Sequence, residues 1–517
     1  MAGSSVTGFL TALMVAPHVM ASLTVYDALG FIVAVILLSL YLMKRQSTLP
    51  LPPGPRALPI VGNLFDMPAI RPWVQYTRWA EQYNSDVVYL QVVSQPLVIL
   101  NSATAAFELL EKRASVYSDK PLTVMQQLVG WTWNIALMPY GPRWRSIRRV
   151  FHQQFNAGAL HKYRHVQERE VAAYLRRELA APEASVRSIN HLFSAIILDI
   201  VYGTHIKSAD DPAVTTVQEA VASFGDINVI GAFWVDSFPI LRHLPAWIPG
   251  LTFHGYVAKY APRVRAMRDG TVDIVKREVA QGIVKPSIAH TLLREIKEQH
   301  GGSSTYEEEE CQAVDAVSVS YVASVETSQS STSWFIIAMA LFPQVQHAAQ
   351  REIDLALGTK ISRLPTHDDI DSLPYLQAVY LETLRWRPAL PVGLPHRCMI
   401  EDEYRGRRIP NGALVVPNTW KMCHDPQDYP DPENFNPDRF LKNGILDSSV
   451  LDPTTMIFGF GRRICAGRHF AKDALLLTFA SILSVFNIEP ALDAEGCPRK
   501  IQTDIPAGAL LYVFSSS

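Results

Sequence analysis

The pattern of apolar and polar positions predicts a mainly helical fold with small β-sheets. Carboxylates at Glu307–Glu310 suit the positive end of a helix dipole and begin the longest helical candidate. The β-rich run Val87–Asn101, with Pro96 near a turn, predicts a hairpin. Shorter strands are expected between Val392 and Val416. The predicted helices cover residues 142–155, 307–342, 372–387 and 467–486.

The longest apolar run lies near the N-terminus, from Leu23 to Met43, and is broken by Asp27. About 20 apolar residues span a bilayer, so we expect a transmembrane anchor within residues 1–45. Lys44 and Arg45 follow the run and predict that its C-terminal side faces the cytosol. A cleaved signal peptide is the alternative, but the basic pair is on the wrong side for one.

Composition narrows the classes of protein that remain. The prolines of residues 49–55 predict a stiff hinge over residues 46–56, and no further linker divides residues 57–517, which we interpret as one large domain. The net charge of −2 argues against a dedicated nucleic-acid binder. The five cysteines are scattered and lack CxxC spacing, which argues against a disulfide framework or a zinc site.

One decapeptide combines a cysteine with glycines and arginines, Phe458-Gly459-Phe460-Gly461-Arg462-Arg463-Ile464-Cys465-Ala466-Gly467. We expect Gly459, Gly461 and Gly467 to allow positive φ and close approach to a flat ligand. The arginines favour the thiolate of Cys465, which is the form that binds metal. The alternative is a glycine-rich turn that holds a buried structural cysteine.

Five positions of this loop resemble the haem-binding loop of the cytochrome P-450 family, namely Phe458, Gly461, Arg463, Cys465 and Gly467. The resemblance extends to membrane-anchored members and to fungal members of secondary metabolism. It implies the P-450 fold and a haem-thiolate catalytic domain over residues 57–517. It also implies haem b as cofactor, with Cys465 as the axial iron ligand; such a thiolate pushes electron density toward iron and favours O–O cleavage.

Two further segments match the same family. Glu382 and Arg385 are followed by Trp386-Arg387-Pro388, as in the family's ExxR helix, and Asn436–Phe440 matches its PERF-like segment. The resemblance implies a buried structural network of Glu382, Arg385 and Arg439 behind the haem. The residues implied to hold the haem propionates are Trp144, Arg148, His396 and Arg463. For Trp144 and Arg148 the alternative is an ordinary amphipathic helix face. For His396 it is an ordinary polar histidine in a loop.

The longest helix supplies the expected oxygen-activation segment, Ala323–Ser328. The resemblance implies that Glu326 and Thr327 are catalytic, with an acid and an alcohol relaying protons through water. A hydroxyl bonded to the i−4 carbonyl can also bend the helix. Ser324 stands where the family usually has glycine, and we expect it to narrow the oxygen groove and add a competing hydrogen bond. A polar stripe in a buried helix is the alternative.

Clustered cations suggest where an electron donor binds. The resemblance implies an NADPH–cytochrome P-450 reductase as partner, with cytochrome b5 as an optional second donor. It also implies a location at the endoplasmic reticulum membrane, with the catalytic domain on the cytosolic face. Positive charge would steer an acidic donor, although the arginines could be merely solubilising. The cations concerned are Arg143, Arg145, Arg148, Arg149, Arg462, Arg468 and Lys472.

Four apolar segments are candidates to line a substrate pocket for a terpenoid, steroid-like or polycyclic aromatic molecule. Core packing is the alternative for each of them, and residues 224–250 could instead enter a membrane surface. The segments are Thr123–Met138, which we interpret as an apolar loop, Phe224–Gly250, Ala389–Val392 and Ile505–Leu510. The leading hypothesis is a monooxygenase; a haem-thiolate isomerase or dehydratase that needs no reductase and a non-catalytic haem sensor or carrier remain alternatives.

Overall fold

The computed structural model describes residues 30, 49–68, 70–182, 185–358, 363–493 and 495–501. The predicted anchor (residues 1–45, apart from Gly30) and the apolar segment 505–510 lie outside these ranges. In the part of the chain that the structure describes, we find no helix both long and apolar enough to cross a bilayer.

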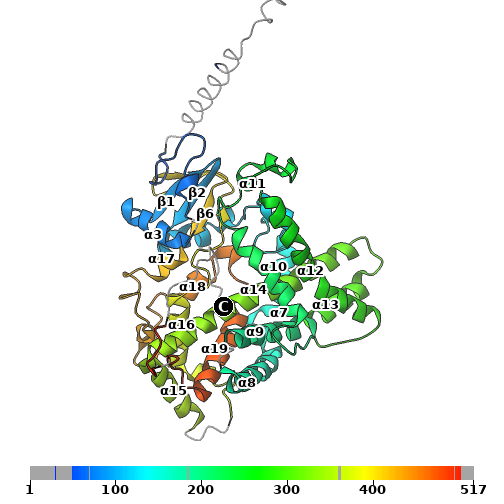
Figure 1. Cartoon of the computed structure of the whole chain (residues 1–517), viewed down its shortest axis with the longest axis vertical. Helices are drawn as coiled ribbons and strands as arrows, with labels where there is room; N and C mark the ends of the chain where they lie inside the picture. The colour runs from blue at the N-terminus through cyan, green and yellow to red at the C-terminus, as the bar shows by residue number, and fades with distance from the viewer. Residues whose placement is uncertain are drawn as a thin grey trace, which may run out of the picture. The chain divides into compact units, whose positions relative to one another are not determined.

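Helices make up most of the described chain (Figure 1). The long helices are α3 (Pro72–Gln82), α7 (Pro142–Phe155), α8 (Arg164–Ala180), α9 (Ser185–Tyr202), α10 (Pro212–Asp226), α12 (Phe253–Ala280), α13 (Ile288–His300), α14 (Tyr306–Leu341), α15 (Pro343–Leu357), α16 (Pro374–Trp386) and α19 (Arg468–Val485). The short helices are α4 (Ala103–Ala106), α5 (Ala114–Tyr117), α6 (Val124–Val129), α11 (Trp234–Ser237), α17 (Thr419–Cys423) and α18 (Thr454–Ile457). A π-helical segment, η3, covers Phe107–Lys112, and 3-10 turns are η2 (Leu64–Asp66), η4 (Ala157–Lys162), η6 (Pro239–His243), η7 (Ile370–Ser372), η8 (Pro437–Phe440) and η9 (Gly461–Arg463).

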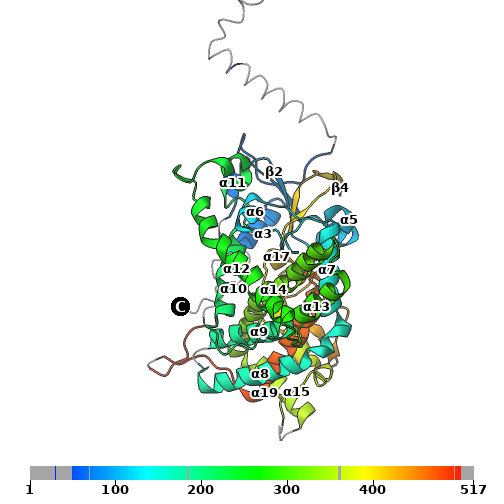
Figure 2. The same cartoon turned by 90° about the vertical axis from the view of Figure 1, so that its right-hand side faces the viewer.

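The four helices predicted from the sequence are confirmed as α7, α14, α16 and α19. Proline in the first turn explains two of the starts, since Pro142 and Pro374 need no partner for a backbone N–H. The helix α14 lies in the middle of the molecule in both views, with α7, α9 and α13 beside it (Figures 1 and 2). It is buried nearly all round, which is the pattern of a core helix. Phe335 of α14 stacks on Phe479 of α19, with ring centroids 3.9 Å apart.

A four-stranded sheet has the order β1-β2-β6-β3. The predicted hairpin is confirmed as β1 (Val87–Val92) and β2 (Gln95–Leu100), which pair antiparallel. The strand β6 (Leu414–Pro417) runs parallel to β2, and β3 (His396–Arg397) pairs antiparallel with β6. The small sheets are β4 (Asp402–Tyr404) with β5 (Arg407–Ile409) and β7 (Leu441–Lys442) with β8 (Ile445–Leu446).

The chain divides into two compact units. Of the residues that the structure describes, those before residue 52 and residues 403–408 belong to one unit, and those within 52–402 and 409–501 belong to the other. The first boundary falls within the predicted hinge, whose described residues 49–56 contain neither helix nor strand. Within the smaller unit, the carbonyl of Pro50 accepts the Arg408 N–H at 2.9 Å.

The interpretation of Thr123–Met138 as a loop was wrong in its first half, which forms α6. The Thr123 hydroxyl accepts the Gln126 N–H at 3.2 Å, and the Gln126 side chain accepts the Thr123 N–H at 3.1 Å. This reciprocal capping box starts the helix, and Gly130 ends it at φ +94°. The Thr-x-x-Gln spacing was a readable signal, but six residues are too few for helical periodicity to show.

Candidate functional site

The loop that carries Cys465 is built by close packing between distant segments. The Cys465 N–H donates to the Phe458 carbonyl at 2.7 Å and closes the loop. Gly461 has φ +55°, and a Cβ there would lie 2.4 Å from the Leu110 carbonyl oxygen on η3. Only glycine therefore fits at position 461. Phe460 fixes the same approach, because its ring meets Phe107 edge to face at 5.7 Å.

The three glycines of this loop differ in their roles. Gly459 and Gly461 take positive φ, as the sequence predicted. The prediction was wrong for Gly467, whose φ is −89° because it caps the N-terminus of α19. Its N–H bonds to Cys465 and opposes the effect of burial, which raises the pKa of that thiol. Gly467 thus acts through its backbone donor and not through conformational freedom.

Two guanidinium groups support Cys465 from α7 and α19. Arg148 Nη2 donates to the Ile464 carbonyl at 2.5 Å, and Arg468 Nη1 donates to the Cys465 carbonyl at 3.2 Å. Both positive charges lower the pKa of the Cys465 thiol against the larger effect of burial. Cys423 has a different environment, because burial raises the pKa of its thiol to about 12. A partly exposed cysteine flanked by cations suits a metal ligand better than Cys423 does.

Three cations gather beside this loop. Arg463 donates to the carbonyls of Ser118, Ile135 and Met138 at 2.6, 3.1 and 2.8 Å. Burial and, less strongly, the Arg148 charge together lower the pKa of Arg463 to about 10. Lys120 donates to a carbonyl at 2.9 Å and has its pKa held well below the usual range by burial and by Arg463.

Carboxylates are scarce around these three cations. Of the described residues, Asp119 is the one carboxylate that raises the pKa of Lys120 and Arg463. Asp119 also lies 3.8 Å from Arg397, so its charge is shared with a further cation. The excess of positive charge fits a ligand with two carboxylates. Trp144 belongs to the same cluster, since its indole donates to Ile135 at 3.0 Å and its ring lies 4.3 Å from the Arg463 guanidinium.

An accessible stretch interrupts the burial of α14. Ala323 is exposed and Glu326 and Thr327 are partly exposed, although the residues on both sides are buried. The Thr327 hydroxyl donates to the Ala323 carbonyl at 2.9 Å, as expected of a hydroxyl bonded to i−4. Burial raises the pKa of Glu326, which favours its acid form. The helix stays continuous through this stretch.

Ser324 bonds within its own helix. Its hydroxyl donates to the Tyr321 carbonyl at 3.2 Å. The predicted extra hydrogen bond is therefore directed to a backbone oxygen one turn back, and the Ala323 carbonyl remains the partner of Thr327. Serine at this position does not disturb the Thr327 contact.

Comparison with known proteins decides the family. A family model described as Cytochrome P-450 matches residues 52–510, which is most of the chain. This protein belongs to the cytochrome P-450 family. Fungal relatives agree: cytochrome P-450 monooxygenase COX1 of Coprinopsis cinerea is 39% identical over 491 residues, covering 92% of this chain and 93% of that protein. Tryptamine 4-monooxygenase of Psilocybe cyanescens is 37% identical over 462 residues, covering 88% and 89%.

Family membership identifies the chemistry in general terms. Cytochromes P-450 are haem-thiolate oxidoreductases in which a cysteine is the axial ligand of iron, and their monooxygenases use a redox partner and act on small molecules. The residues of this P-450 fit the haem: a cysteine with cationic support, and three cations that match two propionates, of which Lys120 is buried and Arg148 and Arg463 are half-buried. Cytochrome P-450 monooxygenase COX2 of Coprinopsis cinerea is also similar, at 37% identity over 454 residues, 88% of this chain and 85% of that protein.

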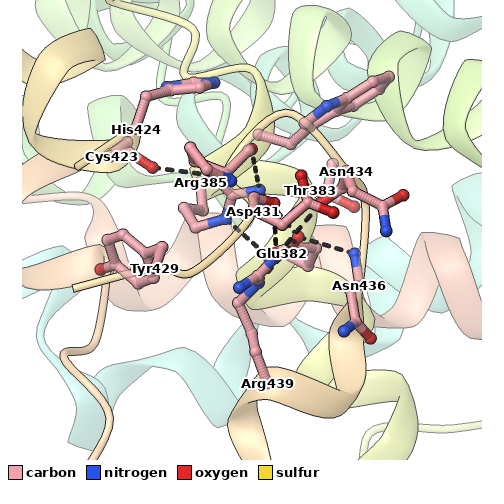
Figure 3. Close-up of polar contacts among 12 residues, drawn as sticks. Glu382, Thr383, Arg385, Cys423, His424, Tyr429, Asp431, Asn434, Asn436 and Arg439 are labelled. Carbon is pink, nitrogen blue, oxygen red and sulfur yellow. Dashed lines mark hydrogen bonds and ion pairs between the residues drawn. The ribbon is translucent and has the colours of Figure 1, made fainter. Parts of the chain in front are cut away.

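The ExxR helix of this P-450 brings its three charged residues together (Figure 3). Glu382 binds Arg385 through both carboxylate oxygens, with Oε2–Nε at 2.6 Å and Oε1–Nη2 at 2.8 Å. Arg439 Nε reaches Glu382 Oε1 at 3.2 Å. The Glu382 and Arg385 side chains are fully buried, and that of Arg439 is nearly so.

Backbone groups complete this network (Figure 3). Arg385 donates to the carbonyls of Cys423 and Pro432, both at 2.8 Å. The Asn436 N–H donates to Glu382 Oε1 at 2.8 Å. Arg439 donates to the carbonyls of Pro430, Asp431 and Asn434. Two arginines and one carboxylate thus hold the irregular segment 423–439 against α16, which is a structural role.

His396 lies buried on β3, and its bonding restricts what it can hold. Its Nδ1 lies 2.7 Å from the Tyr117 carbonyl, which can only accept, so Nδ1 carries the proton. The neutral ring then offers Nε2 as an acceptor. Burial, and next the Lys120 charge, hold the His396 pKa well below its usual range. His396 could therefore donate to a propionate only as an imidazolium, which makes it weaker in this role than Arg463.

Sequence reasoning missed Lys120. It follows the last turn of α5 in a short polar loop, and no motif spacing marks it. Its environment comes from contacts across the chain, since its partner Leu394 is 274 residues away. The one readable signal was a lysine between Asp119 and Pro121, which is too common a pattern to indicate burial.

Proposed function

We propose that this P-450 inserts one oxygen atom from O2 into an apolar small molecule, while NADPH supplies two electrons through a reductase and the second oxygen atom leaves as water. The accessible Glu326–Thr327 pair within the buried helix α14 carries this proposal. When bound, the haem supplies oxygen activation. A carboxyl group with a raised pKa beside a hydroxyl suits proton transfer to a reacting oxygen through water.

The remaining roles follow the chemistry of each group. We assign Cys465 as the axial ligand, because the Gly467 N–H and two guanidinium groups favour its thiolate. The propionates would be held by Arg148 and Arg463, aided by Lys120. His396 would add a bond only as an imidazolium, and Trp144, whose one N–H is bonded to the Ile135 carbonyl, would pack beside Arg463. Phe458, Gly461 and Gly467 shape the cofactor loop, and Glu382, Arg385 and Arg439 maintain the fold behind it.

Isotope labelling tests the reaction class. Purified protein, reductase and NADPH are incubated under labelled O2 with terpenoids, steroids and polycyclic aromatics, and products are analysed by mass spectrometry. The expected product gains one labelled oxygen atom and depends on NADPH. Product formed without NADPH would favour an isomerase or dehydratase, and haem binding with no turnover across the panel would favour a sensor or carrier.

The proposed substrate class rests on the relatives, and aromatic residues gather in the candidate pocket segment that follows α6. Trp131 stacks on Trp133 at 5.6 Å and meets Phe224 edge to face at 5.3 Å. Trp131 and Trp133 are buried in the core, so these rings form a packed wall and not an open surface. Similarity to tryptamine 4-monooxygenase supports an aromatic ring system, and the fungal relatives support a role in secondary metabolism. Binding of each panel compound, measured by its effect on the haem spectrum, ranks the classes.

We place the reductase on a basic surface shared by α7 and the cysteine loop. Arg145 and Arg462 both lie over the Tyr140 ring, at 5.6 and 5.4 Å, so the two segments form one surface. Arg149 and Lys472 add exposed charge. Arg143 does not take part, because it pairs with the buried Asp315 at 2.7 Å. Charge reversal at Arg145 and Arg462 should slow electron transfer, most at low salt, while a reductase rate equal to wild type would exclude this surface. Cytochrome b5 is tested on the same variants.

We propose that the protein works at the endoplasmic reticulum membrane with its catalytic domain on the cytosolic side. Two segments, residues 58–70 and 234–247, expose large apolar side chains. They approach each other, because a Cβ on Gly231 would lie 3.3 Å from Leu64 Cδ1. Vesicle flotation of protein lacking residues 1–45, with and without serine at the exposed positions, tests this surface; equal flotation would exclude it. The exposed residues are Leu58, Ile60, Phe65, Ile70, Trp234, Ile240, Leu244 and Trp247.

A further inference from the structure

A carboxylate from α11 holds the start of α6. Asp236 Oδ1 accepts the Met125 N–H at 2.8 Å, and the same carboxylate also bonds to the Val124 N–H and the Thr123 hydroxyl. The first N–H groups of a helix have no partner within the helix, and a negative charge there is favourable. Asp236 supplies that partner from 111 residues away. We name residues 123–138 the strap.

Two buried hydrogen bonds fix the first half of the strap to the same region. Gln126 Nε2 donates to Asn228 Oδ1 at 2.8 Å, while its Oε1 closes the capping box. Trp131 Nε1 donates to Ser223 Oγ at 3.0 Å. Because these groups are buried, losing one partner would leave the other without solvent to replace it. The first half of the strap therefore follows any displacement of α10 and α11.

The second half of the strap is bonded to the cofactor loop. Its carbonyls at Ile135 and Met138 accept two nitrogens of Arg463, at 3.1 and 2.8 Å. Ile135 also accepts the Trp144 indole at 3.0 Å. Arg463 lies two residues before Cys465, so the strap touches the loop next to the proposed ligand.

Hydrogen bonds also order the residues between the two ends of the strap. Asn134 N–H donates to the Trp131 carbonyl at 3.1 Å, and the Asn134 carbonyl accepts the N–H groups of Leu137 and Met138 at 3.0 and 2.9 Å. The stacked Trp131 and Trp133 rings stiffen the same stretch. One hydrogen-bonded path thus connects α11 to Arg463.

We propose that Asp236 is a positioning residue that sets, through the strap, how Arg463 is held beside Cys465. The inference rests on the proposed function, since it assumes that the loop binds haem. The helix α11 is the end that outside contacts can move, because Trp234 is 54% exposed. Contacts made at α11 are therefore felt at the cofactor loop.

Hydrogen exchange of the haem-loaded protein tests the path at both ends. In Asp236→Ala we expect faster exchange over residues 123–131 and also over residues 458–467, with Asp236→Asn intermediate because an amide oxygen still accepts. Haem transfer to an acceptor globin should quicken by about tenfold, the size expected for loss of a charge-assisted hydrogen bond. Asp226→Asn is the matched control, because Asp226 accepts from the Tyr256 hydroxyl at 3.0 Å and makes no contact with the strap in the described part of the chain.

A merely local role gives a different result. If Asp236→Ala lowers the unfolding temperature but matches Asp226→Asn in haem transfer and in exchange over 458–467, the path is excluded. Should Asp236→Ala not fold, Trp131→Phe removes the hydrogen bond to Ser223 and keeps an aromatic ring at this position. Haem transfer and exchange over residues 458–467 are then measured on that variant. A thiolate-haem spectrum that survives Cys465→Ala would instead overturn the proposed function itself.

Discussion

Two clusters of cationic side chains differ in how their charge is balanced. Around Glu382, both Arg385 and Arg439 bind one carboxylate and a shell of backbone carbonyls. Beside Cys465, the cations Lys120 and Arg463 are bonded to carbonyls, with Asp119 as the nearest carboxylate that acts on both.

The difference separates scaffold from site. Glu382 raises the pKa of Arg385 against the effect of burial, so that cluster is stabilised by its own charges. Burial lowers the pKa of Lys120 and of Arg463, and the few nearby charges do not compensate. A cluster whose cations are held at a cost in the folded chain is one that an anionic ligand stabilises. Electrostatic balance thus distinguishes the Glu382 cluster from the cluster of Lys120 and Arg463.

The largest expected effect comes from the two cysteines that accompany these clusters. Cys465→Ala should abolish the shifted absorption band that thiolate-ligated haem shows when reduced and bound to carbon monoxide. Cys423→Ala should keep it, because that thiol has its pKa raised to about 12 and belongs to the scaffold. Loss of the band in Cys423→Ala and its retention in Cys465→Ala would make Cys423 the haem ligand instead.

Next in size is the loss of the scaffold carboxylate. Glu382→Gln leaves Arg385 buried without a counter-charge and should lower the free energy of unfolding by about 3–5 kcal/mol, as measured by denaturant titration. Glu433→Gln is the matched control, because its side chain is 67% exposed and its pairing with Arg387 is long, at 3.7 Å. Its loss should cost less than about 1 kcal/mol. Similar values for both variants would refute the distinction.

A smaller effect is expected at the site cluster. Lys120→Met should leave the unfolding free energy of haem-free protein unchanged or raise it, since a costly buried charge is removed. Haem dissociation should nevertheless become about tenfold faster, because a charged hydrogen bond to the ligand is lost. Faster dissociation together with a large loss of haem-free stability would make Lys120 part of the scaffold.

The smallest effect is the pH dependence of the same lysine. The folded haem-free protein holds the Lys120 pKa well below its unfolded value, so the unfolded chain binds more protons between these two values. Unfolding free energy should therefore rise with pH in that window, by at most about 1.4 kcal/mol per pH unit, and fall as pH drops. Comparison of wild type with Lys120→Met from pH 7 to 9 isolates this contribution, and parallel curves would contradict it.

Local signals explain what the sequence could predict. Pro142 located α7 to the residue, and the spacing of Glu382 and Arg385 placed both on one face of α16. Lys120 and Asp236 were missed because their partners lie 274 and 111 residues away. No local pattern encodes such contacts. The assignments of Cys465, Glu326 and Thr327 remain predictions that the experiments above test.

The cysteine loop, residues 458–467, is far along the sequence from the residues it contacts, and this distance has a consequence for biosynthesis. Arg463 and Ser118 are 345 residues apart, and a ribosome that adds 5–20 residues per second needs roughly 17–70 s between them. The segment around Ser118 is therefore translated long before the cysteine loop that contains Arg463. A nascent chain shorter than about 465 residues contains no Cys465. With Cys465 as the proposed ligand, we expect cofactor loading to wait until synthesis is almost finished. The cellular supply of haem then matters at release from the ribosome, when the earlier helices have had time to fold.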